Sequence, residues 1–183
     1  MKISKLCLVF AVMSFAVCVR GQDQKKTPPP VTLKSALLEQ LKSTHTNSDW
    51  FVCANVAVAG LTPEQANWTD GKGNHSVGQL THHLVYWNKR NLERIKGEQL
   101  EKFSGNNDET FDKFDAKTWN ATVQELDAIL TEFEKMVENA DDAKLQAIAP
   151  TIAHISAHNA YNIGQIVFVR KEQGSWDPSK GVK

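Results

Sequence analysis

The chain has 183 residues, with 21 basic and 21 acidic side chains, so its formal net charge is zero. This balance gives no electrostatic footprint for nucleic acid, and we expect no nucleic-acid partner. Hydrophobic residues make up 41% of the chain and charged residues 23%, which is typical of a globular domain with a sizeable core.

Residues 1–21 have the pattern of an export signal. Two lysines form a positive start, and residues 6–19 are an uncharged, mostly apolar run. A membrane span needs ~20 such residues, so this run is short for one. We predict cleavage after Gly21 and an exported protein, periplasmic or secreted, without a membrane span. An uncleaved anchor and lipidation at Cys18 are the alternatives.

A proline-rich linker follows at residues 22–30, with the sequence QDQKKTPPP. We place the folded domain at residues 31–176 and a C-terminal tail at 177–183. Cleavage of the signal would leave Cys53 as the last cysteine, so no internal disulfide could form. Cys53 lies in an apolar stretch, which favours a buried, unreactive side chain over a reactive thiol.

Leucines and valines at helical spacing predict one long, imperfect helix within residues 33–58, ended by Gly60 and Pro63. A second helix begins after Ser76 and runs through Ile95 to a stop at Gly97. Its start has a capping box, because a glutamine stands three residues after the serine.

Two further helices are predicted in the second half of the chain. Residues 98–115 are polar and form a long connection, after which Asp115 or Thr118 caps a third helix that runs through Ala140. A fourth helix is expected to begin at Pro150, because proline suits a first helical turn, and to run through Gln173 to a stop at Gly174. Residues 141–149 before it read as a short helical turn or a loop.

These elements predict an all-α fold, because no alternating strand pattern of useful length is present. Four long amphipathic helices in one domain favour a four-helix bundle. Such bundles build their binding sites from the side chains of facing helices.

The sequence HISAHNAYNIGQI, residues 154–166, is the strongest candidate for a site. His154, His158 and Asn162 follow one another at four-residue spacing and share one face of a helix. Two imidazoles at that spacing can both reach one cation at ~2.0–2.1 Å. His83, on the inner face of the second helix, is the natural third ligand, and His45 is a further candidate. The alternative is a set of hydrogen-bonded histidines at a helix interface.

Two segments resemble one family. HNAYNIGQIVFVRKEQGSW resembles the last helix of the DinB-like (YfiT-like) proteins, and SVGQLTHHLVYWNKRNLERIKG resembles their second helix. The resemblance extends through GLTPEQANW and covers essentially the mature chain. It implies an up-down four-helix bundle, often a homodimer, in which three histidines bind a divalent metal. Relatives with known activity include thiol-dependent transferases and isomerases that use bacillithiol or mycothiol.

The resemblance implies a metal site for nickel, zinc or iron. His83 matches the second-helix ligand and His158 the first ligand of the last helix, but Asn162 stands where a second histidine is expected. An amide oxygen binds such metals more weakly than imidazole does. His154, one turn earlier, is the alternative ligand. We assign substrate contacts to three further residues, namely Tyr161, Gln165 and Trp87.

Two functions follow from this reading. The first is an exported, metal-dependent enzyme of the hydrolase or transferase type with an unknown small-molecule substrate. The second is a non-catalytic bundle that binds a small molecule or a partner and whose metal site has degenerated. The asparagine at position 162 is the observation that favours the second.

Overall fold

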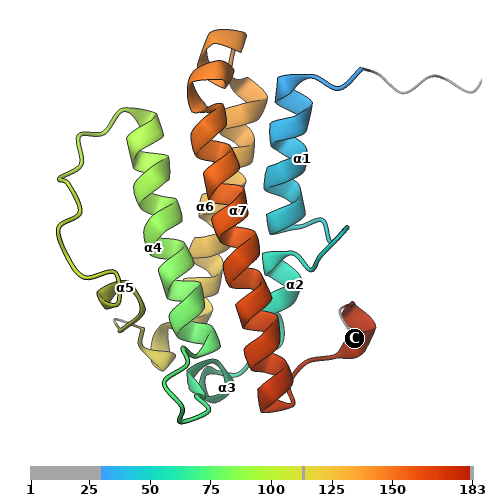
Figure 1. Cartoon of the computed structure of the whole chain (residues 1–183), viewed down its shortest axis with the longest axis vertical. Coiled ribbons are helices and arrows are strands. Elements are labelled where there is room, and N and C mark those ends of the chain that lie inside the picture. The colour runs from blue at the N-terminus through green and yellow to red at the C-terminus, as the bar shows by residue number, and fades with distance from the viewer. Residues whose placement is uncertain (1–29, 113, 182–183) are drawn as a thin grey trace, which may run out of the picture. The chain divides into compact units, whose positions relative to one another are not determined.

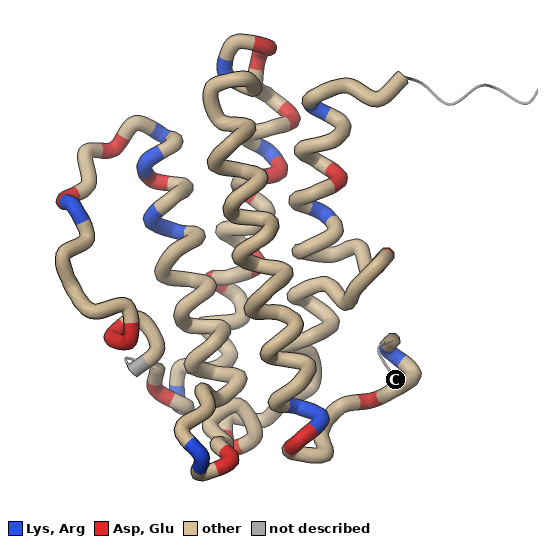
Figure 2. The backbone as a smooth tube through the Cα atoms, in the orientation of Figure 1, with Lys and Arg blue, Asp and Glu red and all other residues tan. Residues whose placement is uncertain are grey.

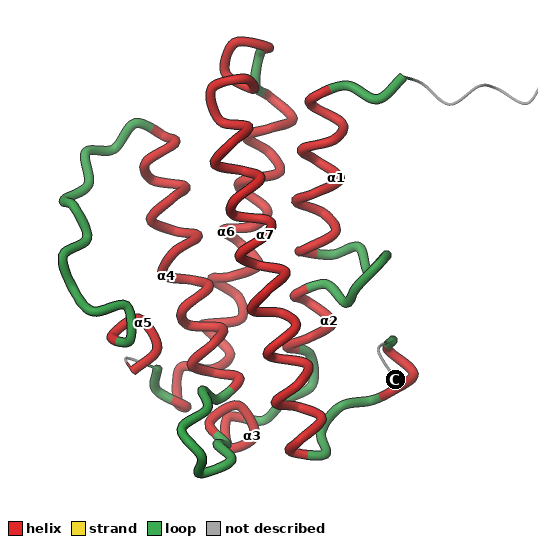
Figure 3. Tube along the Cα trace, viewed as in Figure 1, coloured by secondary structure: helices red, strands yellow, loops and turns green. Residues whose placement is uncertain are grey.

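The structure, a computed structural model, describes residues 30–112 and 114–181, and those from Val31 onward form one compact unit. The predicted signal 1–21, with Cys18, and all of the linker but Pro30 lie outside the described residues. Within the described part every regular element is a helix, which confirms the all-α class (Figure 3). In chain order the elements are α1 (Leu33–His45), α2 (Ala54–Val58), α3 (Pro63–Asn67), α4 (Val77–Lys96), α5 (Glu109–Asp112), η1 (Ala116–Thr118), α6 (Trp119–Asn139), α7 (Asp142–Gln173) and η2 (Pro178–Lys180).

The long helices α1, α4, α6 and α7 form the predicted four-helix bundle, in which α1 and α4 each contact both α6 and α7 (Figure 1). Ion pairs join Lys89 to Glu125 at 2.9 Å and Lys96 to Glu132 at 3.0 Å, so α4 and α6 run in the same direction. This direction is possible because the connection at residues 98–115 returns along the bundle. Helix α7 runs antiparallel to α4.

Both predicted ends of α4 and the predicted C-terminal end of α7 are confirmed. The Ser76 hydroxyl accepts a hydrogen bond from the Gln79 backbone amide at 3.1 Å. The Gln79 side-chain oxygen in turn accepts one from the Ser76 backbone amide at 2.9 Å. Gly97 and Gly174 cap the two helices with φ of 95° and 76°, a conformation that favours glycine. These caps fix the length of the two helices that carry the candidate site residues.

The prediction of one long helix within residues 33–58 is wrong, because α1 ends at His45 and a separate helix, α2, begins at Ala54. Trp50 lies in the segment between the two helices, and 94% of its surface is exposed. Cys53 is buried as predicted and accepts a hydrogen bond from Ser48 at 3.3 Å. Its backbone amide also donates to the Ser48 hydroxyl, and this local network replaces helical bonding.

The predicted start of the last helix at Pro150 is also wrong, because α7 begins at Asp142 and Pro150 lies inside it. The Asp141 carboxylate accepts a bond from the Lys144 amide at 2.8 Å and caps the helix there. Leu145 and Ile148 are buried in the core. A proline removes one backbone bond from a helix interior. Here the cap and the packing of this first part offset that loss.

The bundle core is apolar and continuous. Helix α6 contributes an inner row at helical spacing that packs between α1 and α4, with Phe133 fully buried at its centre. Burying one such side chain contributes roughly 1.5–3 kcal/mol. Helix α7 carries no charged residue between Lys144 and Arg170 (Figure 2).

No helix in the described part has the length and apolar character that a membrane crossing requires.

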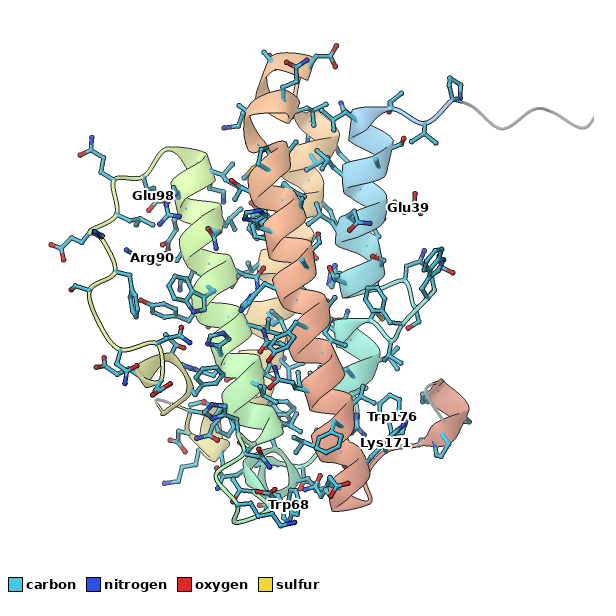
Figure 4. All side chains as sticks on the ribbon, in the orientation of Figure 1. Glu39, Trp68, Arg90, Glu98, Lys171 and Trp176 are labelled. Carbon is cyan, nitrogen blue, oxygen red and sulfur yellow. The ribbon has the colours of Figure 1, made fainter. Side chains whose placement is uncertain are left out.

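Two tryptophans are buried at the lower end of the bundle. Trp119 is 2% exposed and donates from its indole nitrogen to the Leu61 carbonyl at 3.0 Å. Trp176 follows α7 and donates to the Gly181 carbonyl at 3.1 Å (Figure 4). The segment after α7 therefore packs back onto the fold.

Candidate functional site

A groove of about 590 Å³ runs between α4 and α7. These helices lie side by side in Figure 1. From α4 the lining residues are His83, Trp87, Asn88, Asn91 and Arg94. From α7 they are Pro150, Thr151, His154, Ile155 and His158, and Asn107 comes from the connection at 98–115. The groove therefore joins three of the predicted histidines and Trp87.

Two imidazoles face each other across the groove. The Nε2 atoms of His83 and His158 lie 3.1 Å apart. His83 Nδ1 lies 2.6 Å from the hydroxyl of Thr110, which itself donates to the Asn107 carbonyl at 2.6 Å. Since the hydroxyl hydrogen is used there, the hydrogen-bond network assigns a proton to Nδ1 of His83. The Nε2 atom of a neutral His83 then presents a lone pair to His158.

Burial keeps the histidine pair neutral. The pKa of His83 is lowered from 6.5 to about 4, mainly by burial and to a smaller extent by the nearby His158, His75 and His82. Burial also lowers the pKa of His158. Both imidazoles are therefore uncharged at neutral pH, which is the state that binds metals and accepts protons.

Helix α5 covers His83 and is held by other histidines. The Phe111 ring lies between the rings of His75 and His83, with its centre 3.9 Å from each ring centre and nearly parallel to both. His82 Nδ1 donates to the Thr110 carbonyl at 2.8 Å. The connection thus carries two residues of the site that the sequence did not indicate.

Asn162 lies outside the groove lining. Its side chain is 2% exposed, and its Nδ2 atom donates to the His158 carbonyl at 2.9 Å. His154 is exposed and lines the groove one turn before His158. Among the described residues, no three His, Cys, Asp or Glu side chains are placed to hold one metal ion. Of the predicted ligands, the structure brings His83 and His158 together.

The two other predicted substrate contacts lie apart from the groove. The Tyr161 side chain is 70% exposed, and Gln165 is half-buried on the same helix. Neither residue lines the groove. Their proposed roles stay predictions.

A buried asparagine pair joins α4 to α7 beside the histidines. Asn88 donates to the Asn159 side chain at 2.8 Å and accepts from it at 3.2 Å, and both residues are 1% exposed. A paired amide is the state in which such a group can be buried without a large desolvation loss. Asn107 also accepts a bond from the Trp87 indole at 3.1 Å, which ties the connection to the groove. The sequence did not indicate these contacts. The one available signal was an asparagine in the buried row of α4.

His45 is not available as a ligand, contrary to the prediction that it was a further candidate. Its Nδ1 lies 2.7 Å from a Glu134 oxygen and its Nε2 lies 2.9 Å from an Asp127 oxygen. Asn55 donates to the same Asp127 oxygen at 2.7 Å. Both ring nitrogens are occupied, and the residue joins α1 to α6 rather than α4 to α7.

Comparison with known proteins agrees with this architecture. A family model described as the DinB superfamily matches residues 54–168. This range contains both imidazoles of the pair and every residue that lines the groove. No curated protein matches the chain, and no solved structure does. The match covers more than half of the sequence and agrees with the helical bundle, so the chain belongs to the DinB superfamily.

Proposed function

We propose that the groove binds a small molecule and that His83 and His158 hold a divalent cation at its buried end. The observation that carries this proposal is the 3.1 Å separation of the two Nε2 atoms. Two nitrogens that are each ~2.0–2.1 Å from one cation subtend about 100° at that separation, which suits tetrahedral or octahedral coordination. The Thr110 hydroxyl supports the arrangement, because an outer hydrogen bond orients a ligating imidazole.

The pair fits two coordination positions, and the chain offers weaker donors for the others. The amide nitrogen of Asn162 is used by the His158 carbonyl, so the amide oxygen is the atom that remains. We propose that water and the bound molecule complete the coordination, with His154 as the alternative third ligand. Imidazole ligands suit zinc, nickel or iron.

When bound, the cation would polarise a carbonyl of the bound molecule, or lower the pKa of a thiol or a water that coordinates to it. The chain's own residues do the remaining work. Trp87 and Ile155 exclude water from the middle of the groove, while Asn91, Thr151 and His154 offer polar groups that orient the ligand. We therefore propose a metal-dependent hydrolase or transferase.

A second candidate function is a non-catalytic binding protein. The 3.1 Å between the Nε2 atoms is also a hydrogen-bond distance, so His158 could donate directly to His83 without a cation. The replacement of the expected third histidine by Asn162 favours the same conclusion. In this case the groove keeps its ligand and loses its metal chemistry.

We further propose that the protein is exported, because residues 1–21 have the pattern of a cleaved signal. Expression of the full chain in a bacterial host, followed by mass measurement of the extracytoplasmic fraction, tests this. A chain that begins at Gln22 supports cleavage. An intact chain that stays in the cytoplasm contradicts export, and a lipid on Cys18 would replace cleavage after Gly21.

The metal content of the purified protein tests the main proposal. The protein would be loaded with zinc, nickel or iron(II) separately, and the bound metal measured by elemental mass spectrometry. We expect about one cation per chain in the wild type and none in His158→Ala. His82→Ala is the matched control, because it removes a neighbouring histidine that also holds α5. A wild type without metal after loading would leave the binding-only function.

A gain-of-function variant tests the missing ligand. Asn162→His restores the residue that the family pattern has there, and we expect it to raise metal affinity by at least about tenfold, or 1.4 kcal/mol. The measurement is competition with a metal-binding dye at neutral pH. An unchanged affinity would mean that position 162 does not face the cation.

A further inference from the structure

We infer that the ligand of the groove is an elongated organic acid whose anionic group binds Arg94, at the end of the groove opposite the histidine pair. This inference rests on the proposed function only in taking the groove as a small-molecule site, and it does not require the metal.

The groove is long in one direction. On α4 its lining extends from His83 to Arg94, which at 1.5 Å per residue is about 16 Å along the helix. On α7 it extends from His158 back to Pro150, about 12 Å. The two helices are antiparallel (Figure 1), so the lining residues His83 and His158 fall at one end of the groove and Arg94 and Pro150 at the other. A ligand that fills this space must be elongated.

The charge of the groove is concentrated at one end. Among the described residues that line it, Arg94 is the one Lys or Arg side chain, and none is Asp or Glu. Its guanidinium makes one long hydrogen bond, to the Asn91 side chain at 3.4 Å. No ion pair of Arg94 occurs in the part of the chain that the structure describes. Most of its five donors therefore remain for a ligand.

The other cations of α4 have different partners. Lys89 and Lys96 form ion pairs with Glu125 and Glu132 of α6, on the side of α4 away from the groove. Arg90 faces the connection at 98–115 and donates to the Glu101 carbonyl (Figure 4). Arg94 alone of these four lines the groove without a carboxylate beside it.

The lining between the two ends sets the rest of the ligand's chemistry. Trp87 and Ile155 provide an apolar middle, and the asparagines and Thr151 provide polar groups around it. A guanidinium binds a carboxylate through two parallel hydrogen bonds, which are strengthened by the opposite charges. A neutral amide lacks this charge. The class of ligand is therefore an organic acid with an apolar or aromatic middle that extends toward the histidine end.

Two matched probes test the inference on the full purified chain. 4-Phenylbutanoate carries an aromatic ring and a carboxylate, and 4-phenylbutanamide has the same shape without the charge. Their affinities would be measured by NMR titration, with the Arg94 Nε–H resonance as the local signal. We expect the acid to bind the wild type about tenfold more tightly than the amide. Arg94→Gln should abolish this difference.

Lys96→Gln is the control, since it removes a cation two residues away that lies outside the groove. It should keep the preference for the acid. Equal affinities of the two probes for the wild type overturn the inference, as does a preference that survives Arg94→Gln or a complete lack of binding. A preference lost in Arg94→Gln supports it even if the protein binds no metal, so the two proposals fail separately.

Discussion

Two histidine clusters in the same bundle have opposite kinds of partner. Between α1 and α6, both ring nitrogens of His45 contact carboxylates, at 2.7 and 2.9 Å. Between α4 and α7, His83 faces His158 in a groove where no carboxylate occurs among the described lining residues. An imidazole whose two nitrogens both contact carboxylates can only stabilise the fold, whereas the neutral pair has nitrogen lone pairs that can bind a ligand. The function of a buried histidine is therefore decided by its partners and not by its position on an inner helix face.

The largest expected effect is on stability, at the saturated cluster. His45→Ala should lower the free energy of unfolding by about 2–4 kcal/mol, because it removes two bonds to charged groups and leaves Glu134 largely buried without its partner. His158→Ala should lower it by less than about 1 kcal/mol, since one hydrogen bond between neutral groups is lost. Urea denaturation at pH 7 measures both.

That measurement also tests whether the two clusters differ in their contribution to stability. If the two variants lose equal stability, the histidine pair is as structural as His45, and the division between the clusters is wrong. His45→Gln refines the result, because an amide can keep one of the two bonds. It should fall between the wild type and His45→Ala.

The next effect is the pH dependence of stability. Burial is the main cause that lowers the pKa of His83 to about 4, below its ordinary 6.5. Between pH 6.5 and pH 4, His83 is therefore protonated in the unfolded chain and neutral in the folded chain. The stability that this group contributes is complete above pH 6.5 and is lost as the pH falls toward 4. We expect a loss of about 2 kcal/mol between pH 7 and pH 4.5 from this residue.

His83→Gln isolates that contribution from the titration of the carboxylates. The variant should lose less stability than the wild type over the same pH interval, by about 2 kcal/mol. Denaturation curves at the two pH values for both proteins give the difference. If the two proteins respond identically, His83 does not titrate with a lowered pKa in the folded state.

Much of the fold could be predicted from the sequence, because local signals and tertiary packing agree there. Ser76 and Gly97 bound α4 as predicted, through a capping box and a left-handed glycine. The failures lie where packing overrides a local signal. Pro150 should end or begin a helix by its own chemistry, yet the buried Leu145 and Ile148 extend α7 in front of it.

The candidate site was predictable only in part. The i, i+4 spacing and the resemblance indicated His83 and His158, and the structure brings them together. Thr110 and Phe111 were not indicated, because their segment is a polar connection whose contacts depend on how the chain returns along α4. Sequence periodicity describes the faces of helices, but it does not describe which loop covers a face.

The smallest effect concerns that covering segment. Thr110→Val removes the oxygen that accepts the His83 Nδ1 proton, so the imidazole loses the bond that orients it. We expect a fall in metal affinity of about tenfold, at the lower end of what such outer bonds contribute. The loss of stability should be only about 1 kcal/mol.

Thr122→Val is the matched control, because Thr122 is also buried and its hydroxyl donates to a carbonyl of its own helix at 3.1 Å. Both variants should unfold at similar urea concentrations, while Thr110→Val alone should weaken metal binding. If Thr122→Val weakens it equally, the effect comes from a general loosening of the bundle. If neither does, the orientation of His83 is set by its stacking on Phe111, which would give that ring the role assigned to the hydroxyl.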